Sequence, residues 1–277
     1  MLERWRSDYV LWVEAFALLN LAFLTVDIYL AHSANAFRNS AEYIPLYFSL
    51  AAPILLIVGL LARERWNRPG IWRAAGYGVG AMAIAVGLAG VIYHLDSQFF
   101  YERTLRSLTY AAPFAAPLAY TGIGLLLVMN RMVDVRTPEW SEWVLLLTTA
   151  GFLGNFVLSL TDHATNGFFN SSEWIPVGSA AFAVSFLLAL FLRRVDWRYL
   201  VVCAGVLLLQ AGIGVLGFLL HVIADVHGPS HRFFDNVISG APPFAPLLFP
   251  NLAVLGWIGL WAMRRTDLGS GATRPSA

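Results

Sequence analysis

The sequence predicts an all-α polytopic membrane protein with eight transmembrane helices, formed by tandem duplication of a four-helix unit, with both termini in the cytoplasm. Of its 277 residues, 58% are hydrophobic and only 13% are charged, whereas about a quarter of the residues of soluble domains are charged. The apolar residues fall into eight long runs, and the two halves of the chain share sequence patterns. The composition therefore predicts a membrane protein, and the repeats predict two four-helix units.

Each apolar run approaches the roughly 20 residues that a helix needs to cross a hydrocarbon core about 30 Å thick. Charged or polar segments separate the runs. The predicted spans are residues 9–31, 43–62, 72–95, 108–130, 143–160, 174–192, 200–224 and 241–263. We therefore expect a multi-pass protein of the cell (inner) membrane that contacts the lipid bilayer.

Arginine divides unevenly between the two sets of connections. All 18 basic residues are Arg, and 14 of them lie in the N-terminal segment, the C-terminal tail and the three even-numbered connections. The other four connections hold only Arg38, Arg103, Arg106 and Arg232. Because connections rich in Arg are retained in the cytoplasm, both termini are predicted to be cytoplasmic.

Residues 32–45 align without a gap on residues 163–176, with eight of fourteen positions identical. Two shorter matches join Gly87-x-x-Gly-x-x-x-His94 to Gly214-x-x-Gly-x-x-x-His221, and Pro113-Phe-Ala to Pro243-Phe-Ala. These matches predict two parallel repeats, residues 1–136 and 137–265, that superpose with His32 over His163 and His94 over His221. Residues 266–277 are rich in Gly, Ser, Thr and Pro and are predicted to be a disordered tail.

All six histidines lie at the outer ends of the predicted helices or in the outer connections. Imidazole is a common ligand of transition metals and haem iron, and a nearby carboxylate can fix its tautomer. We therefore expect a haem or transition-metal site near the extracytoplasmic face, with a redox or metal-handling function. The predicted ligands are the repeated histidines His32, His94, His163 and His221, and the further metal ligands are Asp96, Asp162 and Asp225.

Other residues of the repeats have a simpler explanation. Asn39 with Glu42, and Asn170 with Glu173, have the spacing of a helix capping box. Phe37 and Phe168 are interpreted as anchors at the membrane interface. The two remaining histidines, His227 and His231, flank a Gly-Pro sequence and are predicted to lie in a loop.

The composition excludes several function classes. With no Lys, the chain cannot form a retinal Schiff base, a pyridoxal phosphate site or a P-loop. The single Cys203 excludes disulfide scaffolding and iron–sulfur ligation, and a net charge of +1 leaves no basic surface for nucleic acid. Two alternatives stay open: a non-catalytic membrane subunit or binding module that docks an extracytoplasmic partner or an amphiphile, and a transporter of a neutral substrate.

The predicted architecture, two tandem four-helix bundles with histidines toward the outer leaflet, is similar to that of the haem A synthases, in which such histidines bind haem. The resemblance covers the topology of nearly the whole chain and implies haem as the cofactor. The Glu-His-x-His motif of that family is missing from this sequence. The reaction of the family is therefore not implied.

The predicted topology can be tested by labelling single cysteines in a Cys203→Ser background. Cysteines at Ser97 and Ser172 should react with an impermeant thiol reagent added outside intact cells, because both positions lie in Arg-poor connections. A cysteine at Asn67, in an Arg-rich connection, should react only after the membrane is opened. Labelling of the Asn67 variant alone from outside would invert the topology.

Overall fold

The computed structural model describes residues 8–193 and 195–271 and is all-helical, with 82% of residues in helices and no strand among the described residues. Seven helices are long and apolar enough to cross a membrane, which is compatible with a multi-pass membrane protein. They are α2 (Tyr9–Ser33), α3 (Tyr43–Glu64), α4 (Pro69–Asp96), α8 (Pro138–Thr165), α9 (Trp174–Leu192), α10 (Trp197–Val226) and α12 (Leu248–Gly271).

The fourth predicted span, residues 108–130, is wrong at its start. The chain there forms two short helices, α5 (Phe99–Glu102) and α6 (Leu105–Thr109), then a segment without a continuous helix, and then α7 (Leu118–Met132). Pro113 and Pro117 lie in that segment, and proline has no N–H with which to continue a helix. With 15 residues, α7 is the shorter apolar helix beside the seven long ones.

The eighth predicted span also begins too early. After α10 the chain forms the short helix α11 (Phe233–Ser239) and a 3-10 turn, η3 (Ala245–Leu247), and only then α12. Pro242, Pro243 and Pro246 disfavour an earlier helix start. At its other end α12 continues to Gly271, into the region predicted to be a tail, and residues 272–277 lie outside the described part of the chain.

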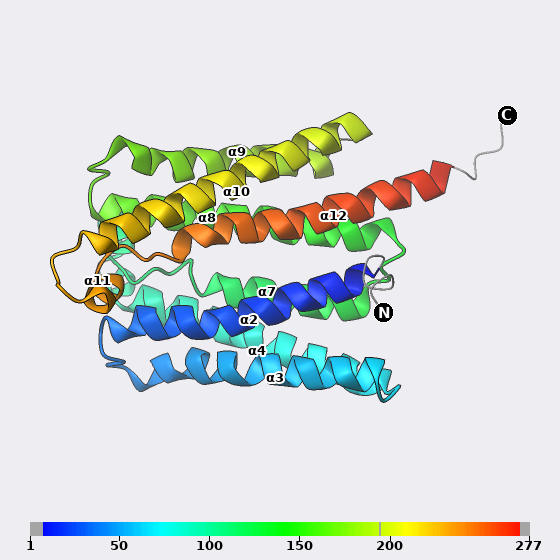
Figure 1. Ribbon diagram of the computed structural model, residues 1–277, viewed down its shortest axis with the longest axis horizontal. Coiled ribbons are helices and arrows are strands. Elements are labelled where there is room, and N and C mark those ends of the chain that lie inside the picture. Colours follow the sequence, from blue (N-terminus) through cyan, green and yellow to red (C-terminus); the bar gives the residue numbers. More distant parts are fainter. Residues whose placement is uncertain (1–7, 194, 272–277) are drawn as a thin grey trace.

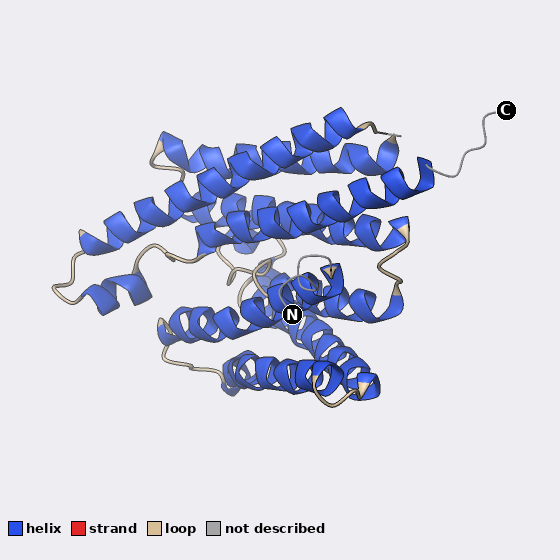
Figure 2. Cartoon of the chain, turned by 45° about the vertical axis from the view of Figure 1, so that its right-hand side comes forward, coloured by secondary structure: helices blue, strands red, loops and turns tan. Residues whose placement is uncertain are grey.

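The helices run side by side, with α2, α3, α4 and α7 in one group and α8, α9, α10 and α12 in the other (Figure 1). Helix α2 begins and α12 ends at the same end of the bundle, and α11 lies beyond the opposite end (Figures 1 and 2). We call this opposite end, where α2, α4, α8 and α10 end, the histidine end. Large apolar side chains such as Leu19, Ile54 and Leu208 are more than 60% exposed, which implies contact with the lipid bilayer.

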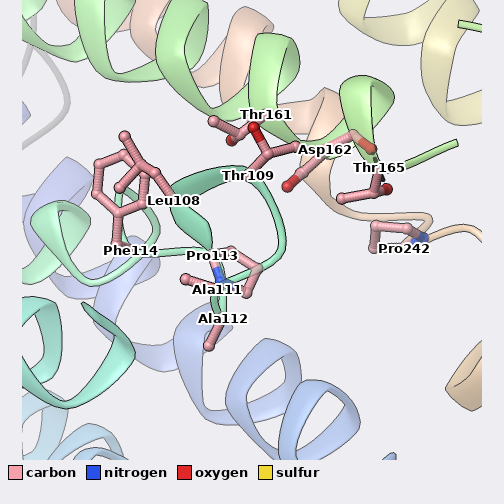
Figure 3. A pocket seen from close by; sticks show the side chains of 10 residues that line it. All are labelled: Leu108, Thr109, Ala111, Ala112, Pro113, Phe114, Thr161, Asp162, Thr165 and Pro242. Atoms are coloured by element: carbon pink, nitrogen blue, oxygen red, sulfur yellow. Dashed lines mark hydrogen bonds between the residues drawn. The ribbon is translucent and has the colours of Figure 1, made fainter. Parts of the chain in front are cut away.

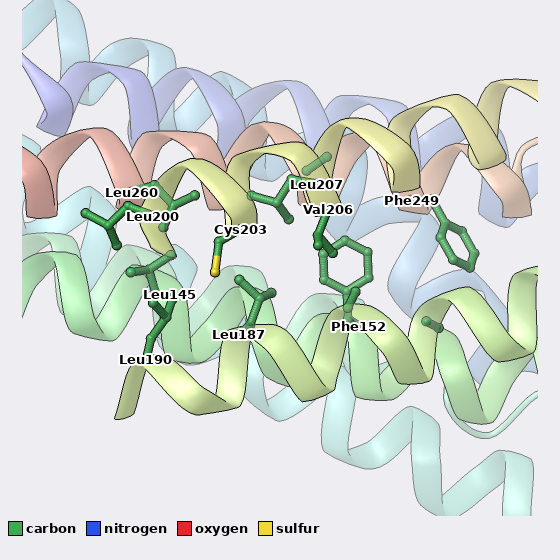
Figure 4. Close-up of a cluster of buried hydrophobic side chains, with 13 residues drawn as sticks. Leu145, Phe152, Leu187, Leu190, Leu200, Cys203, Val206, Leu207, Phe249 and Leu260 are labelled. Carbon is green, nitrogen blue, oxygen red and sulfur yellow. The ribbon is translucent and has the colours of Figure 1, made fainter. Parts of the chain in front are cut away.

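Three buried clusters hold the helices together. One contains residues of α2, α3, α4 and α7, including Leu21, Leu56 and Val79. A second lies within α8, α9, α10 and α12 around Leu187 and Leu207 (Figure 4). The third joins the two groups, because it combines residues of α2 and α7 with residues of α8 and α12. Each half therefore has its own core, and a shared core fixes one half against the other.

A buried ion pair lies at the end of the bundle opposite the histidines. Arg131 of α7 donates from Nη2 to Oε1 of Glu14 of α2 at 2.7 Å, and its Nη1 lies 2.7 Å from Glu14 Oε2. Both side chains are at most 1% exposed. The guanidinium also lies over the ring of Trp72 of α4, 3.9 Å from its centroid. A side chain at Gly76 would collide with this guanidinium, which explains the glycine there.

Neighbouring polar groups extend this contact into the second half. Asn130 Nδ2 donates to the carbonyl oxygen of Val10 at 3.1 Å, and Trp140 Nε1 of α8 donates to Asn130 Oδ1 at 3.3 Å. In the connection between the halves, hydrogen bonds from the Arg136 side chain and backbone lower the pKa of Asp134 to about 2. The start of the second half is thus anchored to the first by hydrogen bonds.

A second polar contact joins the halves within the bundle. Asn20 of α2 donates from Nδ2 to Asn251 Oδ1 of α12 at 3.2 Å, and Asn251 Nδ2 donates in return to Asn20 Oδ1. Two of the polar residues that interrupt the predicted spans therefore satisfy each other. Reciprocal amide pairs of this kind hold transmembrane helices in a fixed register.

We predict that Glu14→Gln lowers the free energy of unfolding by about 3–5 kcal/mol, because it leaves the Arg131 charge buried without its partner. Thermal or denaturant unfolding of the protein in mild detergent measures the change. The double variant Glu14→Leu/Arg131→Met should recover most of the loss, because it buries no charge. Arg136→Gln, at the exposed pair with Asp134, should leave the midpoint unchanged. An unchanged midpoint for Glu14→Gln would show that the pair does not stabilise the fold.

Candidate functional site

The structure brings the repeated histidines together in two pairs at the histidine end. The imidazole centroids of His32 (α2) and His94 (α4) are 6.3 Å apart, and those of His163 (α8) and His221 (α10) are 6.5 Å apart. In each pair the ring planes are close to perpendicular, at 76° and 84°. Two helices of each half thus supply one histidine each, as the repeats predicted.

Backbone carbonyls orient one histidine of each pair. His94 Nδ1 lies 2.8 Å from the carbonyl oxygen of Pro113, and His221 Nδ1 lies 2.8 Å from that of Pro242. Because a carbonyl oxygen can only accept, Nδ1 carries the hydrogen in both rings. Nε2 of a neutral ring then keeps its lone pair, which is the arrangement found in metal-binding histidines.

A glutamate orients the other histidine. His32 Nδ1 lies 3.4 Å from Glu42 Oε2, and His163 Nδ1 lies 3.6 Å from Glu173 Oε2. Sequence analysis assigned both glutamates to capping boxes and missed this contact. Glu42 does close a capping box with Asn39, but its second oxygen faces the histidine. The signal was present in the sequence, because Glu42 and Glu173 are identical positions of the fourteen-residue match.

A left-handed turn places these groups. Phe37 and Phe168 have φ of 51° and 53°, and the N–H of each donates to the side chain of the Asn two residues earlier. Each Phe ring stacks on the aromatic residue six positions later, Tyr43 at 4.7 Å or Trp174 at 3.9 Å between centroids. The rings also lie beside the first histidine of each pair. The phenylalanines therefore shape the site, beyond the interfacial role predicted for them.

Close helix contacts position the second histidine of each pair. A Cβ at Gly87 would lie 2.8 Å from the carbonyl oxygen of Pro117, and one at Gly214 would lie 2.6 Å from that of Pro246. Glycine therefore lets α4 and α10 approach the segments that precede α7 and α12. These contacts, with the two histidine–carbonyl hydrogen bonds, align Pro113 with Pro242. The sequence match of Pro113 to Pro243 is therefore displaced by one residue from the structural alignment, because a three-residue string is too short to determine the register.

The three predicted aspartate ligands differ in exposure and in whether they line a cavity. Asp96 is exposed at the end of α4, whereas Asp225 is only 2% exposed and lies near the end of α10. Asp162 lies beside His163 and lines two cavities. No group of three His, Cys, Asp or Glu side chains that could hold a metal ion occurs in the described residues. Ligation of a metal by the full predicted set therefore stays a prediction.

A cavity of about 560 Å³ lies in the second half, within the range of small-molecule sites. His163 and His221 line it near the histidine end, and Asn155 and Phe249 line it further inside. A smaller cavity of about 310 Å³ lies between the halves, bounded by residues 108–114, α8 and Pro242 (Figure 3). The side chain of Asp162 lines both. No sequence pattern predicted either cavity, since their walls come from segments that are distant in the chain.

Comparison with protein families, curated proteins and solved structures finds no match to this chain. The likeness to the haem A synthases therefore rests on the predicted topology alone. What the chain can do has to be argued from its own site.

Proposed function

We propose that the protein is a membrane-embedded haem-binding protein in which each histidine pair supplies the two axial ligands of one haem. The observation that carries the proposal is the orientation of the imidazoles. In both pairs the Nδ1 atom of each ring faces a carbonyl or carboxylate oxygen, which leaves the Nε2 atoms available to a metal.

The spacing of the rings supports two ligands on opposite sides of one iron. Two metal–nitrogen bonds of about 2 Å, together with the distance from each nitrogen to its ring centre, separate two such rings by about 6 Å. The observed separations are 6.3 and 6.5 Å. Helices of a four-helix bundle are a common scaffold for such a pair.

Haem is favoured over a non-haem metal by the number of ligands. A transition metal bound by the protein alone needs three or four side chains, and the described residues bring no such group together. Haem needs only two axial ligands from the protein. When bound, a haem with two histidine ligands would supply one-electron transfer. Glu42 and Glu173, with the carbonyls of Pro113 and Pro242, would then hold the ligating tautomers.

The same proposal includes the finer topology. We infer a tandem duplication because histidine–glutamate, histidine–carbonyl and aromatic stacking contacts recur in both halves. With α7 as the fourth crossing, the chain crosses the membrane eight times. The excess of Arg in the connections at the other end then puts both termini in the cytoplasm and the histidines near the extracytoplasmic face of the cell membrane.

The proposal predicts a Soret band and reduced-minus-oxidised difference bands in protein purified in mild detergent. Quantified haem should approach two per chain. His94→Ala and His221→Ala should each remove about half of it, and the double variant should remove all of it, because each half loses an axial ligand. The double variant His227→Ala/His231→Ala is the matched control, since these histidines lie outside both pairs.

Two results would overturn this function. One is a folded, full-length protein that is colourless and cannot be loaded with haem. The other is a His94→Ala/His221→Ala variant that keeps the haem content of the parent.

A further inference from the structure

The inner end of the second-half cavity holds a polar side chain without a partner. Asn155 is only 5% exposed, and its Nδ2 atom has no hydrogen-bond partner among the described residues. It lines the cavity from α8, eight residues before His163, which is about 12 Å along the helix. An N–H group buried without an acceptor is costly, and more so at the depth of a membrane. The amide therefore needs an acceptor that the described chain does not supply.

The walls around Asn155 are largely apolar, apart from Ser159 one turn further along α8. Leu158 of the same helix, Ile213 of α10 and Phe249 of α12 line this part of the cavity. Gln210, one helical turn further inside than Gly214, is fully buried and also lacks a partner for its amide in the described chain. The inner end is thus an apolar chamber with hydrogen-bonding capacity and no charged side chain within one turn of Asn155.

The first half differs at the corresponding positions. The offset of the fourteen-residue match places Leu24 at the position of Asn155. The contacts that align Pro117 with Pro246 place Tyr120 at the position of Phe249, and the Tyr120 hydroxyl lies 2.5 Å from Ser49 Oγ. In the first half, therefore, Tyr120 and Ser49 satisfy each other at this level, and the buried Thr121 Oγ1 atom, which also lacks a partner in the described chain, lines neither of the two cavities. In the second half, an amide donor is left facing a cavity.

We propose that this cavity binds an uncharged, lipid-soluble carbonyl compound, the chemistry of a quinone, whose oxygen accepts a hydrogen bond from Asn155 Nδ2. A donor without an acceptor selects a carbonyl oxygen. The inner end has largely apolar walls, whereas Asp162 and Glu173 line the cavity nearer the histidine end, so the inner end suits an uncharged body. Asn155 lies about two helical turns inside the histidines, so the proposed donor is separate from the proposed haem ligands, although His163 and His221 line the outer part of the same cavity.

Binding of menadione, a two-ring quinone, tests the proposal, with 2-methylnaphthalene as the matched probe that lacks both carbonyls. Titrations use full-length Cys203→Ser protein in detergent, with protein-free micelles as the blank. We expect saturable binding of one menadione per chain. Asn155→Leu should weaken it about tenfold, because the carbonyl loses its donor. The affinity for 2-methylnaphthalene should be unchanged by this substitution.

Thr148→Val is the matched control variant. Thr148 is buried on the same helix, two turns from Asn155, and its hydroxyl bonds within the helix to the carbonyl of Val144. This substitution should leave menadione affinity unchanged. Asn155→Leu should fold at least as stably as the parent, since it removes an unpaired buried amide.

Two outcomes would overturn the proposal: no saturable menadione binding by the parent, or equal menadione affinity in the parent and Asn155→Leu. Either would mean that water satisfies the amide. Haem content in the same samples separates this site from the proposed haem sites. Asn155→Leu should keep its haem, and His94→Ala, which changes a residue that does not line this cavity, should keep its menadione affinity.

Discussion

A polar group inside a bilayer has no water to bond, so the protein itself must supply its partner. This constraint explains polar contacts both within the first half and between the two halves. Glu14 neutralises and hydrogen-bonds Arg131, and Asn20 and Asn251 exchange hydrogen bonds across the two halves. An apolar core alone would not select one arrangement of helices, because lipid tails are as apolar as leucine side chains. The polar pairs select it.

The same constraint shapes the histidine sites. The prolines before α7 and α12 prevent a regular helix, and the irregular segments bring the Pro113 and Pro242 carbonyls to His94 and His221. Each hydrogen bond satisfies a half-buried imidazole and also fixes its tautomer. The segments in which proline interrupts the helix thus also orient the imidazoles. The distance from Nδ1 to the carbonyl oxygen is 2.8 Å in both halves.

The two halves share these histidine contacts and differ further inside the bundle. In the first half Tyr120 and Ser49 satisfy each other, whereas in the second half Asn155 faces a cavity without a partner. A buried amide that lacks a partner and also faces a cavity is the observation from which we infer a ligand. The paired histidines and this cavity are the two features on which the proposed haem and quinone sites rest.

Hydrophobic run length and repeated strings are local patterns, and they predict the all-helical class, six of the long helices to within five residues and the repeated positions of four histidines. The sequence did not determine where α7 and α12 begin, since prolines near a helix start are tolerated or disruptive according to the surrounding contacts. Nor did it reveal the contact between Glu42 and His32, the Glu14–Arg131 pair or the cavity at Asn155. Those depend on which helix faces which, and only the packing of distant segments decides that.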